Sequence, residues 1–407
     1  MNRIDGGVTA PRGFQAAGVS AGIKGNEKRD MAMVYSEAPC TAAGVFTQNV
    51  VKAAPVKWDK TVVDTSQYVQ AVVVNSGVAN ACTGEEGYGY CVDMALETGK
   101  CLGIPKEAVL VASTGVIGRQ LPMDKIKWGI GALTQRLGNT REDGRTAAQA
   151  IMTTDTKSKE VAVEMEVGGK KAVVAGMCKG SGMIHPNMAT MLCFVVTDAA
   201  ISHEMLQKAL SAIVADTFNM ISVDGDTSTN DSVLLLANGM AGNDPIREEG
   251  ADFDTFSTAL TEVMTELSKK IAGDGEGCTC LFEAKVTGAK TKEQARVLAK
   301  SIICSNLTKA AIFGHDANWG RILCAMGYSG AEFDPEQVDI YFESRAGKLK
   351  IVENGVDTGY SEEKATEILS QEEVTAIADI KMGTESATAW GCDLTYDYVK
   401  INGDYRS

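Results

Sequence analysis

In the stretch KGSGMIHPNMATMLCFVV, residues 179–196, a loop that can bend sharply leads directly into a strand that is expected to be buried. Its glycines allow positive φ angles and close backbone approach, and Pro186 fixes a further dihedral angle. The apolar run that follows is typical of a buried strand, yet it opens with the hydroxyl of Thr190, directly after Ala189. Any account of the fold has to explain why a reactive side chain stands at that junction.

Two interpretations of this junction stay open from the residues alone. In the first, the loop is a glycine turn between two strands, and Thr190 is simply a strand residue. In the second, the loop presents the Ala189 carbonyl to the Thr190 hydroxyl, an N-to-O acyl shift gives an ester, and water hydrolyses it. Thr190 then becomes a new N-terminus, whose amine, with a reference pKa of about 7.7 to 8.0, acts as a base toward its own hydroxyl.

Composition limits the classes of protein to which the chain can belong. The 407 residues are 44% hydrophobic and 6% aromatic, as in an ordinary globular α/β protein. No apolar run reaches the roughly 18 residues that a membrane helix needs, and the opening segment lacks the apolar core of a secretory signal. Eleven irregularly spaced cysteines fit a reducing compartment, and a net charge of −14 opposes nucleic acids and anionic membranes. We therefore predict a cytoplasmic protein that acts on a small molecule.

Strands and helices are predicted to alternate along the chain, without repeats or low complexity. The expected elements are, in chain order, a strand within 68–84, a helix over 87–103, a strand ending at 113–115, a helix beginning near Pro122, a hairpin turning at 168–169, helices beginning near Ser202 and spanning 252–271, a strand within 278–289, a helix opened by the capping box Thr291 and Gln294, and a strand over 386–407. Neither a dinucleotide fingerprint nor a phosphate loop is present.

Several reactive side chains invite other chemistry. Cys278 and Cys280 form a C-x-C pair, but no second pair lies at ligand spacing, so no metal site is expected. Asp224 and Asp226 fit an Asx-rich turn better than a cation site. His185 lies beside the junction, where it either tunes the loop, packs or faces solvent, and a Ser-His-Asp triad would need one of only three histidines.

Blocks spread over the whole chain are similar to those of one family and stand in its order. They are GVTAPRGFQAAG, AAGVFTQNVVKAAPV, VVVNSGVANACTG, STGVIG, MTTDT, KGSGMIHPNMATML, SVDGDTSTND, DGEG and YVKINGDYRS. The chain thus resembles the ornithine acetyltransferases, also called glutamate N-acetyltransferases of arginine biosynthesis. The resemblance implies a self-processing acyltransferase that is cut between Ala189 and Thr190. The implied reaction moves acetyl from N2-acetylornithine to glutamate by a ping-pong mechanism through an acetyl-Thr190 ester, without a metal or a cofactor.

The same resemblance implies an α/β fold of layered sheets and helices, similar in chemistry to N-terminal-nucleophile hydrolases. Its two chains, 1–189 and 190–407, would be intertwined rather than independent domains. The pairs would assemble as a heterotetramer of two alpha and two beta chains.

Roles for individual residues also follow from the resemblance. Thr190 is the nucleophile, and the Thr114 hydroxyl and the Gly115 N–H are the oxyanion donors, although a strand-end Thr-Gly pair alone is usually a turn. The positions that match the family's substrate-binding residues are Thr153, Lys179, Thr190, Glu276, Asn402 and Ser407. Lys179, otherwise expected to be solvated, suits a substrate carboxylate, and Glu276 suits the side-chain amine of ornithine.

Two rival functions remain open at this point. An amidase or aminopeptidase with an N-terminal nucleophile would release acetyl to water, and an uncut amino-acid-binding protein would show one band on a denaturing gel. The sequence also leaves open whether acetyl-CoA serves as a second donor.

Overall fold

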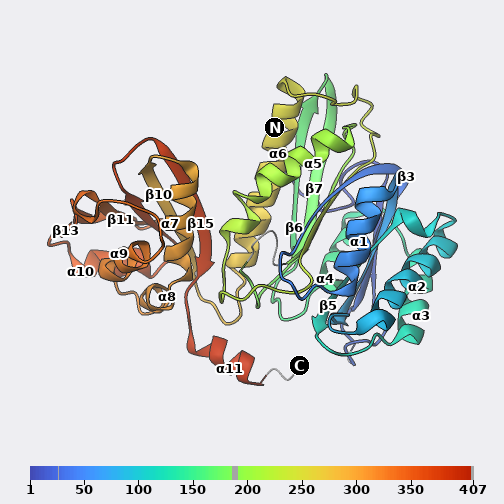
Figure 1. Cartoon of the computed structure of the whole chain (residues 1–407), viewed down its shortest axis with the longest axis horizontal. Helices are drawn as coiled ribbons and strands as arrows, with labels where there is room; N and C mark the ends of the chain where they lie inside the picture. The colour runs from blue at the N-terminus through green and yellow to red at the C-terminus, as the bar shows by residue number, and fades with distance from the viewer. Residues whose placement is uncertain (26, 186–190, 405–407) are drawn as a thin grey trace.

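Two β-sheets, one large and one small, organise the chain (Figure 1). The computed structural model describes residues 1–25, 27–185 and 191–404. Within them, nine strands form the large sheet in the order β1-β6-β7-β8-β9-β3-β4-β5, with β2 paired to β3. These strands are β1 (Asn2–Ile4), β2 (Phe14–Val19), β3 (Met31–Phe46), β4 (Val69–Val78), β5 (Val109–Val116), β6 (Lys159–Val167), β7 (Lys170–Lys179), β8 (Leu192–Thr197) and β9 (Ser232–Ala237).

Strand β3 links two halves of the large sheet. Its residues from Met31 to Tyr35 pair with β4, and those from Thr41 to Phe46 pair with β9, with a change of register between the two runs. Buried side chains from both halves belong to one apolar core. The half with β2, β4 and β5 and the half with β6 to β9 therefore pack as layers.

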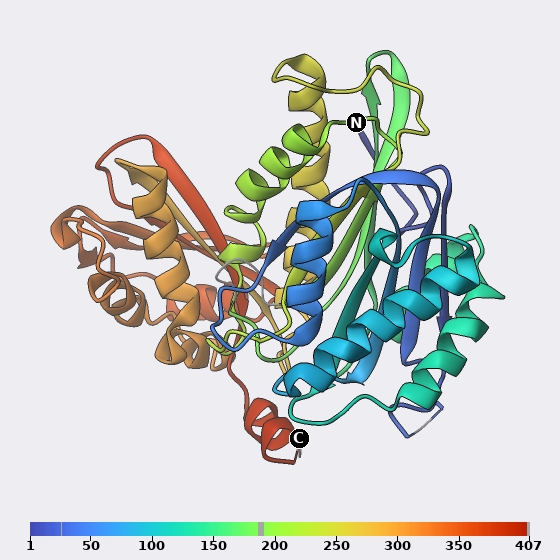
Figure 2. The ribbon, with the colours of Figure 1, turned by 45° about the vertical axis from the view of Figure 1, so that its right-hand side comes forward.

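Helices cover these layers on both sides. They are α1 (Ala54–Thr65), α2 (Gly84–Leu102), α3 (Met123–Thr134), α4 (Arg141–Ala150), α5 (His203–Val214) and α6 (Ala251–Ala272). Helices α1, α2 and α3 pack on the half with β2 to β5, whereas α5 and α6 lie on the other side of the molecule (Figures 1 and 2). Helix α4 contacts β2 and β3 on one side and β6 and β7 on the other, so it fills the space between the halves.

Strand β8, which follows the segment at residues 186–190, is buried on both faces. Leu192 and Phe194 belong to the core shared by the two halves, whereas Cys193 and Val195 belong to the core that includes α5 and α6. A strand covered on both faces needs apolar residues at consecutive positions rather than at alternate ones. This explains the continuous apolar run that opens after Thr190 in the sequence.

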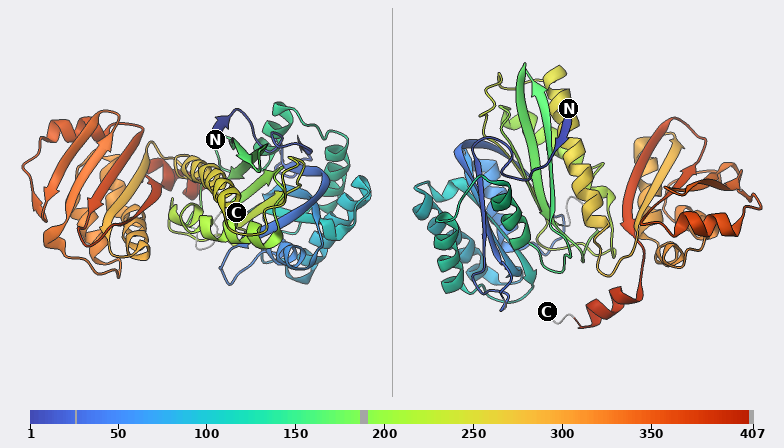
Figure 3. Two further views of the ribbon diagram at one scale, coloured as in Figure 1. Left: turned by 90° about the horizontal axis from the view of Figure 1, so that it is seen from above. Right: turned by 180° about the vertical axis from the view of Figure 1, so that it is seen from behind.

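The small sheet contains β13-β12-β11-β14-β10-β15 in that order. Its elements, with the helices that follow or cover it, are β10 (Leu281–Ala289), α7 (Lys292–Cys304), α8 (Asn306–Phe313), α9 (Trp319–Gly327), β11 (Asp339–Ser344), β12 (Gly347–Glu353), β13 (Val356–Asp357), α10 (Glu362–Leu369), β14 (Glu373–Asp379), β15 (Glu385–Cys392) and α11 (Tyr396–Asp404). The small sheet lies beside the large one, and α11 reaches back toward it (Figure 3).

The predicted α/β class with layered sheets is confirmed, as is the β6–β7 hairpin around residues 168–169. Helices α3 and α5 begin directly after Pro122 and Ser202, as expected. At α7 the Thr291 hydroxyl accepts from Gln294 N–H, but the Gln294 side chain accepts from Lys290 N–H rather than from Thr291. Among the described residues, no helix has both the length and the apolar character needed to cross a membrane.

The prediction of a strand over 386–407 is wrong in its second half, where the chain forms α11. Asp393 ends the strand, because its carboxylate accepts from Thr279 N–H at 2.9 Å and from Cys280 N–H at 3.1 Å. The Thr395 hydroxyl then accepts from Tyr398 N–H at 3.3 Å, which caps the first turn of the helix. The alternating apolar pattern was therefore overridden by a local cap.

Candidate active site

The ends of the parallel strands β4 and β5 bring Thr114 and Gly115 to one point. Gly115 has a φ of +128°, and Gly77 opposite it has a φ of +111°. A Cβ atom at Gly115 would lie only 2.3 Å from the carbonyl carbon of Gly77. Only glycine fits where two backbones approach this closely. The backbone on either side of the Thr114 hydroxyl is therefore fixed by the sheet itself.

Buried amides fasten these strand ends to the loop before β9. The Asn230 side chain donates to the carbonyl oxygens of Ala79 at 2.6 Å and Ser113 at 2.8 Å. The Ser113 hydroxyl donates to the Asn75 side chain at 2.6 Å. Because buried hydrogen bonds of this kind are costly to break, they hold the strand ends in one arrangement.

Lys179, at the end of β7, points to the same place. Its ammonium lies 3.5 Å from the Thr114 hydroxyl oxygen, and each of the two residues is only 8% exposed. The alternative of a solvated lysine is thus wrong. An ammonium group only donates, so the Thr114 oxygen accepts and the hydroxyl proton stays available for another acceptor. A cavity of about 30 Å³, roughly the volume of one water, lies between them and is also lined by Met191, the residue after Thr190.

A buried ion network lies behind these residues. The Lys159 ammonium contacts Asp155 at 2.7 Å and Asp274 at 2.5 Å, with all three side chains at most 8% exposed. Burial opposes ionisation of Asp155, but the positive charges of Lys179 and Lys159 outweigh it and lower the pKa of Asp155 to about 2. Asp155 also accepts from the backbone N–H of Thr153 at 3.0 Å and of Gly180 at 2.7 Å. One carboxylate therefore positions two predicted substrate-binding segments.

Glu276 and Asn402 form a second group. The Asn402 amide donates to a Glu276 carboxylate oxygen at 2.8 Å, and Glu276 is only 9% exposed. A Cβ at Gly182 would lie 2.3 Å from this carboxylate, so the glycine loop packs directly against it. Ser181 ties the same loops together, because its carbonyl accepts from Glu276 N–H at 3.1 Å and its hydroxyl donates to the Asp274 carbonyl at 2.7 Å.

Asp224 holds the part of the glycine loop that leads to residue 186. Its carboxylate accepts from Met183 N–H at 2.7 Å, from Ile184 N–H at 2.9 Å and from Asp226 N–H at 3.2 Å. The expectation of backbone hydrogen bonding at Asp224 is confirmed. The Tyr398 hydroxyl of α11 donates to the same carboxylate at 3.3 Å.

His185, the last described residue before position 191, is half-buried. Its ring lies 3.1 Å from the Ser222 hydroxyl and 3.5 Å from the Cys304 sulfur. Burial, assisted by the positive charge of Lys300, lowers the pKa of His185 to about 4, so the ring is neutral at physiological pH. His185 thus packs, as one of the expected alternatives proposed.

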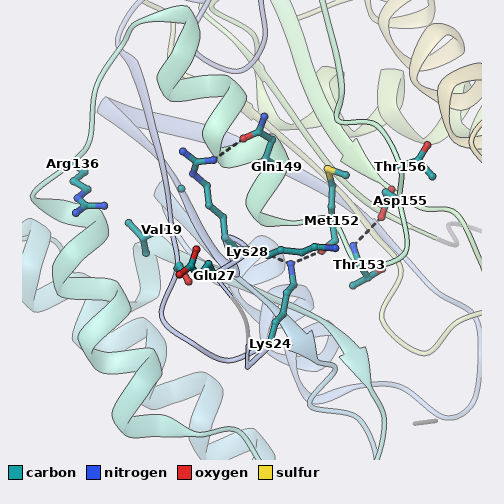
Figure 4. Close-up of a pocket in the computed structure, with 13 residues that line it drawn as sticks. Val19, Lys24, Glu27, Lys28, Arg136, Gln149, Met152, Thr153, Asp155 and Thr156 are labelled. Carbon is teal, nitrogen blue, oxygen red and sulfur yellow. Dashed lines mark hydrogen bonds between the residues drawn. The ribbon is translucent and has the colours of Figure 1, made fainter. Parts of the chain in front are cut away.

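Thr153 lines a different and larger cavity, of about 770 Å³ (Figure 4). This cavity lies between α4, the end of α3 and the lining residues Lys24, Glu27, Lys28 and Arg29. The Lys24 ammonium donates to the carbonyl oxygens of Met152 at 2.7 Å and Arg29 at 2.8 Å. Burial lowers the pKa of Lys24 to about 8.

The cysteines take part in packing near these loops. Cys280 is buried, and a hydrogen bond from Cys278 lowers the pKa of Cys392 below its ordinary value. In the part of the chain that the structure describes, no group of three or more His, Cys, Asp or Glu side chains is placed to hold a metal ion.

The structure brings Thr114, Gly115 and Lys179 to one point and pairs Glu276 with Asn402, and it joins the segments of both groups through the ion network. Ala189, Thr190 and Ser407 lie outside the described residues. Sequence reasoning missed the supporting residues Asp155, Lys159, Asp274 and Asn230. Asp155 and Asp274 stand within or beside the blocks MTTDT and DGEG, but nothing in the sequence marks Lys159 as their buried partner.

Comparison with known proteins adds an independent finding. A family model described as the ArgJ family matches residues 15–407. Arginine biosynthesis bifunctional protein ArgJ of Thermotoga neapolitana is 52% identical over 398 residues, which cover 98% of this chain and 99% of the relative. Arginine biosynthesis bifunctional protein ArgJ 1 of Clostridium acetobutylicum is 54% identical over 394 residues, which cover 97% of this chain and 96% of the relative. The crystal structure of arginine biosynthesis bifunctional protein argJ from Bacillus halodurans matches with a TM-score of 0.50 and 48% identity, over 52% of this chain and 98% of that one.

Proposed function

The chain belongs to the ArgJ family, and on that premise we propose that it transfers an acetyl group from N2-acetylornithine to glutamate, giving ornithine and N-acetylglutamate. Family membership confirms the resemblance to the enzymes of arginine biosynthesis that the sequence blocks indicated. The donor, the acceptor and the residues that act on them are the parts that we propose.

The active protein is formed by a cut between Ala189 and Thr190. Strands β8 and β9, which follow the cut, lie between β7 and β3, which precede it, so both products would remain in one sheet. This supports intertwined chains 1–189 and 190–407. The match covers 98% of the solved Bacillus halodurans chain but only 52% of this chain. This is expected if the solved chain is one of two cleavage products of similar length.

The reaction then passes through an ester on Thr190. The Thr190 amine takes the hydroxyl proton, the oxygen attacks the acetamide carbonyl, and ornithine leaves with that proton before the glutamate amine attacks the ester. The Thr114 hydroxyl and the Gly115 N–H stabilise the oxyanion of each tetrahedral intermediate. Lys179 supports this role, since its 3.5 Å contact occupies the Thr114 oxygen and leaves the proton to donate.

We assign the substrate contacts from the charges of the side chains and of the substrates. Lys179 and Thr153 bind the amino-acid part that both substrates share, and Glu276, oriented by Asn402, receives the side-chain amine of acetylornithine. Ser407 completes this set as the resemblance implies. Acetyl-CoA is the second donor in our proposal, and the chain pairs assemble as a heterotetramer in the cytoplasm.

The contact between Lys179 and Thr114, beside a cavity that Met191 lines, is the observation that carries this proposal. A denaturing gel and an intact mass measurement test it, with fragments 1–189 and 190–407 expected. Thr190→Ala should give one intact chain that transfers no acetyl group, and Thr190→Ser should keep part of both activities. Cleavage that persists in Thr190→Ala would mean that an outside protease makes the cut.

A further inference from the structure

Two cysteine side chains that the proposed reaction does not use lie against each other at the end of β15. The Cys278 thiol donates a hydrogen bond to the sulfur of Cys392, although the two residues stand more than a hundred positions apart in the sequence. The pairing of β10 with β15 brings them together, because Leu281, shortly after Cys278, lies opposite Cys392 in the ladder. All eleven cysteines of the chain are free thiols. The contact therefore joins two reduced cysteines.

The backbone around the two sulfurs is closely packed. A Cβ atom at Gly275 would lie only 2.7 Å from the Cys392 sulfur, so the loop passes this sulfur only with glycine at that position. The Cys278 N–H donates to the Gly275 carbonyl at 2.9 Å, which closes a tight turn before Cys278. Asp393, directly after Cys392, accepts from Thr279 N–H at 2.9 Å. The loop and the end of the strand are thus fastened to each other beside both thiols.

A buried cation stands next to Cys392. The Lys309 ammonium of α8 lies 3.6 Å from the Cys392 sulfur and also donates to the Cys392 carbonyl oxygen, and Lys309 is only 2% exposed. The hydrogen bond from Cys278 and this positive charge lower the pKa of Cys392, although burial and the charge of Asp393 oppose them. The thiolate is the form that attacks another sulfur. Cys392 is therefore suited to attack the sulfur that it contacts.

The two cysteines differ in their access to solvent. Cys392 is 1% exposed, whereas Cys278 is half-buried and lines a cavity of about 670 Å³. This cavity lies between the end of α6, the start of β10 and the start of β14, with Lys269 and Glu373 on its lining. A small oxidant can reach Cys278 through the cavity, and it reaches Cys392 only by way of Cys278.

We propose that Cys278 and Cys392 form a reversible disulfide when hydrogen peroxide enters this cavity, and that the disulfide fixes the loop that carries Glu276 to the strand that leads into α11. The Cys278 sulfur attacks the peroxide, so a sulfur–oxygen bond forms as the oxygen–oxygen bond breaks, giving a sulfenic acid and water. The Cys392 sulfur then attacks the Cys278 sulfur, the sulfur–oxygen bond breaks, and a second water leaves. Both sulfurs are oxidised, the peroxide is reduced, and the two thiol protons end in the two waters.

This disulfide would join the two segments that carry the Glu276–Asn402 pair. Glu276 stands two residues before Cys278, and the chain runs from Cys392 directly into α11, which carries Asn402. In a reducing compartment, disulfides of this kind are usually transient and redox-sensing. The cross-link keeps loop and strand together when the hydrogen bonds around them open, so the backbone N–H groups of residues 274–280 should exchange more slowly with solvent.

Peptide mapping without reduction tests the linkage, after the reduced protein has been treated with hydrogen peroxide and the remaining thiols have been alkylated in denaturant. We expect one cross-linked pair of peptides, containing Cys278 and Cys392, with the loss of two hydrogen atoms in mass and reversal by dithiothreitol. Cys278→Ser should abolish the linkage and leave Cys392 open to alkylation. Cys280→Ser is the matched control and should form the linkage as the parent does, because the Cys280 thiol donates to the Leu281 carbonyl at 3.3 Å.

A linkage of Cys278 to Cys280 in the parent would overturn the proposal. Oxidation of the exposed Cys324 before any linkage of Cys278 to Cys392 would also overturn it, because the pair would then have no special reactivity. Equal hydrogen exchange at residues 274–280 in the oxidised and reduced forms would show that the disulfide does not fix the loop. Both cysteines lie within residues 190–407, so a linkage in a protein that transfers no acetyl group would leave this site standing while the proposed function falls.

Discussion

The two groups of predicted site residues are built in different ways. Thr114, Gly115 and Lys179 stand at strand ends of the large sheet, and at position 115 a Cβ atom would lie only 2.3 Å from the Gly77 carbonyl carbon, so only glycine fits there. Glu276 and Asn402 lie on a loop and on the terminal helix α11, and they meet through one hydrogen bond between side chains. The difference teaches that the groups we assign to the oxyanion are placed by the sheet, whereas the groups we assign to recognition of the substrate's charge depend on loops.

A substitution at Lys159 should have the largest effect on both groups of residues, because Lys159 joins Asp155 on one side to Asp274 on the other. Lys159→Met leaves two buried carboxylates without their cation, and we expect a loss of about 3 to 5 kcal/mol in the free energy of unfolding. Denaturant unfolding in a Thr190→Ala background, where one chain is expected, measures it. If the variant does not fold, Lys159→Arg should restore folding, and a fully stable Lys159→Met protein would refute the network's role.

Thr114→Ala tests only the group of residues at the strand ends of the large sheet. Turnover should fall by about 10² to 10³-fold, because one oxyanion donor is lost. Thr114→Ser keeps the hydroxyl and should retain most of the activity. Thermal melting of both variants should stay close to that of the parent, and unchanged turnover in Thr114→Ala would remove this residue from the mechanism.

Glu276→Gln tests the second group of residues, which is placed by a loop and by α11. Deleting the charge while keeping the shape should weaken acetylornithine binding by about 1.5 to 3 kcal/mol and affect glutamate less. The two half-reactions can be measured apart, by loading Thr190 with acetylornithine and then adding glutamate.

Glu107→Gln, which removes one exposed carboxylate elsewhere on the chain, is the matched control for Glu276→Gln. It should bind both substrates as the parent does. Equal weakening of both substrates by Glu276→Gln would show that Glu276 orders the loop without recognising the amine.

The effect expected at His185, beside the predicted cut, is absent at neutral pH and develops only as the pH falls. Its pKa falls from 6.5 to about 4 on folding, so between these values the unfolded chain binds the extra proton. The contribution of His185 to the free energy of unfolding is therefore complete above pH 6.5 and declines as the pH falls toward 4. Unfolding in the Thr190→Ala background at several pH values should show a steeper decline than in Thr190→Ala/His185→Gln, and parallel curves would contradict the assignment.

Much of the fold followed from local pattern. The hairpin at residues 168–169 and the helix starts at Pro122 and Ser202 depend on turns and caps that a few neighbouring residues decide. Helix α11 was missed because alternating apolar residues near the C-terminus imitate a strand, whereas the Thr395 cap and the contacts of Asp393 decide the outcome. The contacts of Asp393 are with Thr279 and Cys280, more than a hundred positions away, and local pattern does not place them.

Only the site residues that lie within recognisable sequence motifs could be predicted. The Thr-Gly pair at the end of β5 and Lys179 were identified by resemblance, and the structure brings them together. Lys159 was not identified, because its burial between Asp155 and Asp274 joins residues more than a hundred positions apart. Such a pairing is a product of the packed sheets and leaves no local pattern in the sequence.

The central claim is that Thr190 carries the acetyl group. Intact mass measurement after incubation with N2-acetylornithine alone tests it most directly. We predict two chains, of which 190–407 gains the mass of one acetyl group on its first residue and loses it when glutamate is added. One uncut chain, or an acetyl group on any residue other than Thr190, would contradict the account.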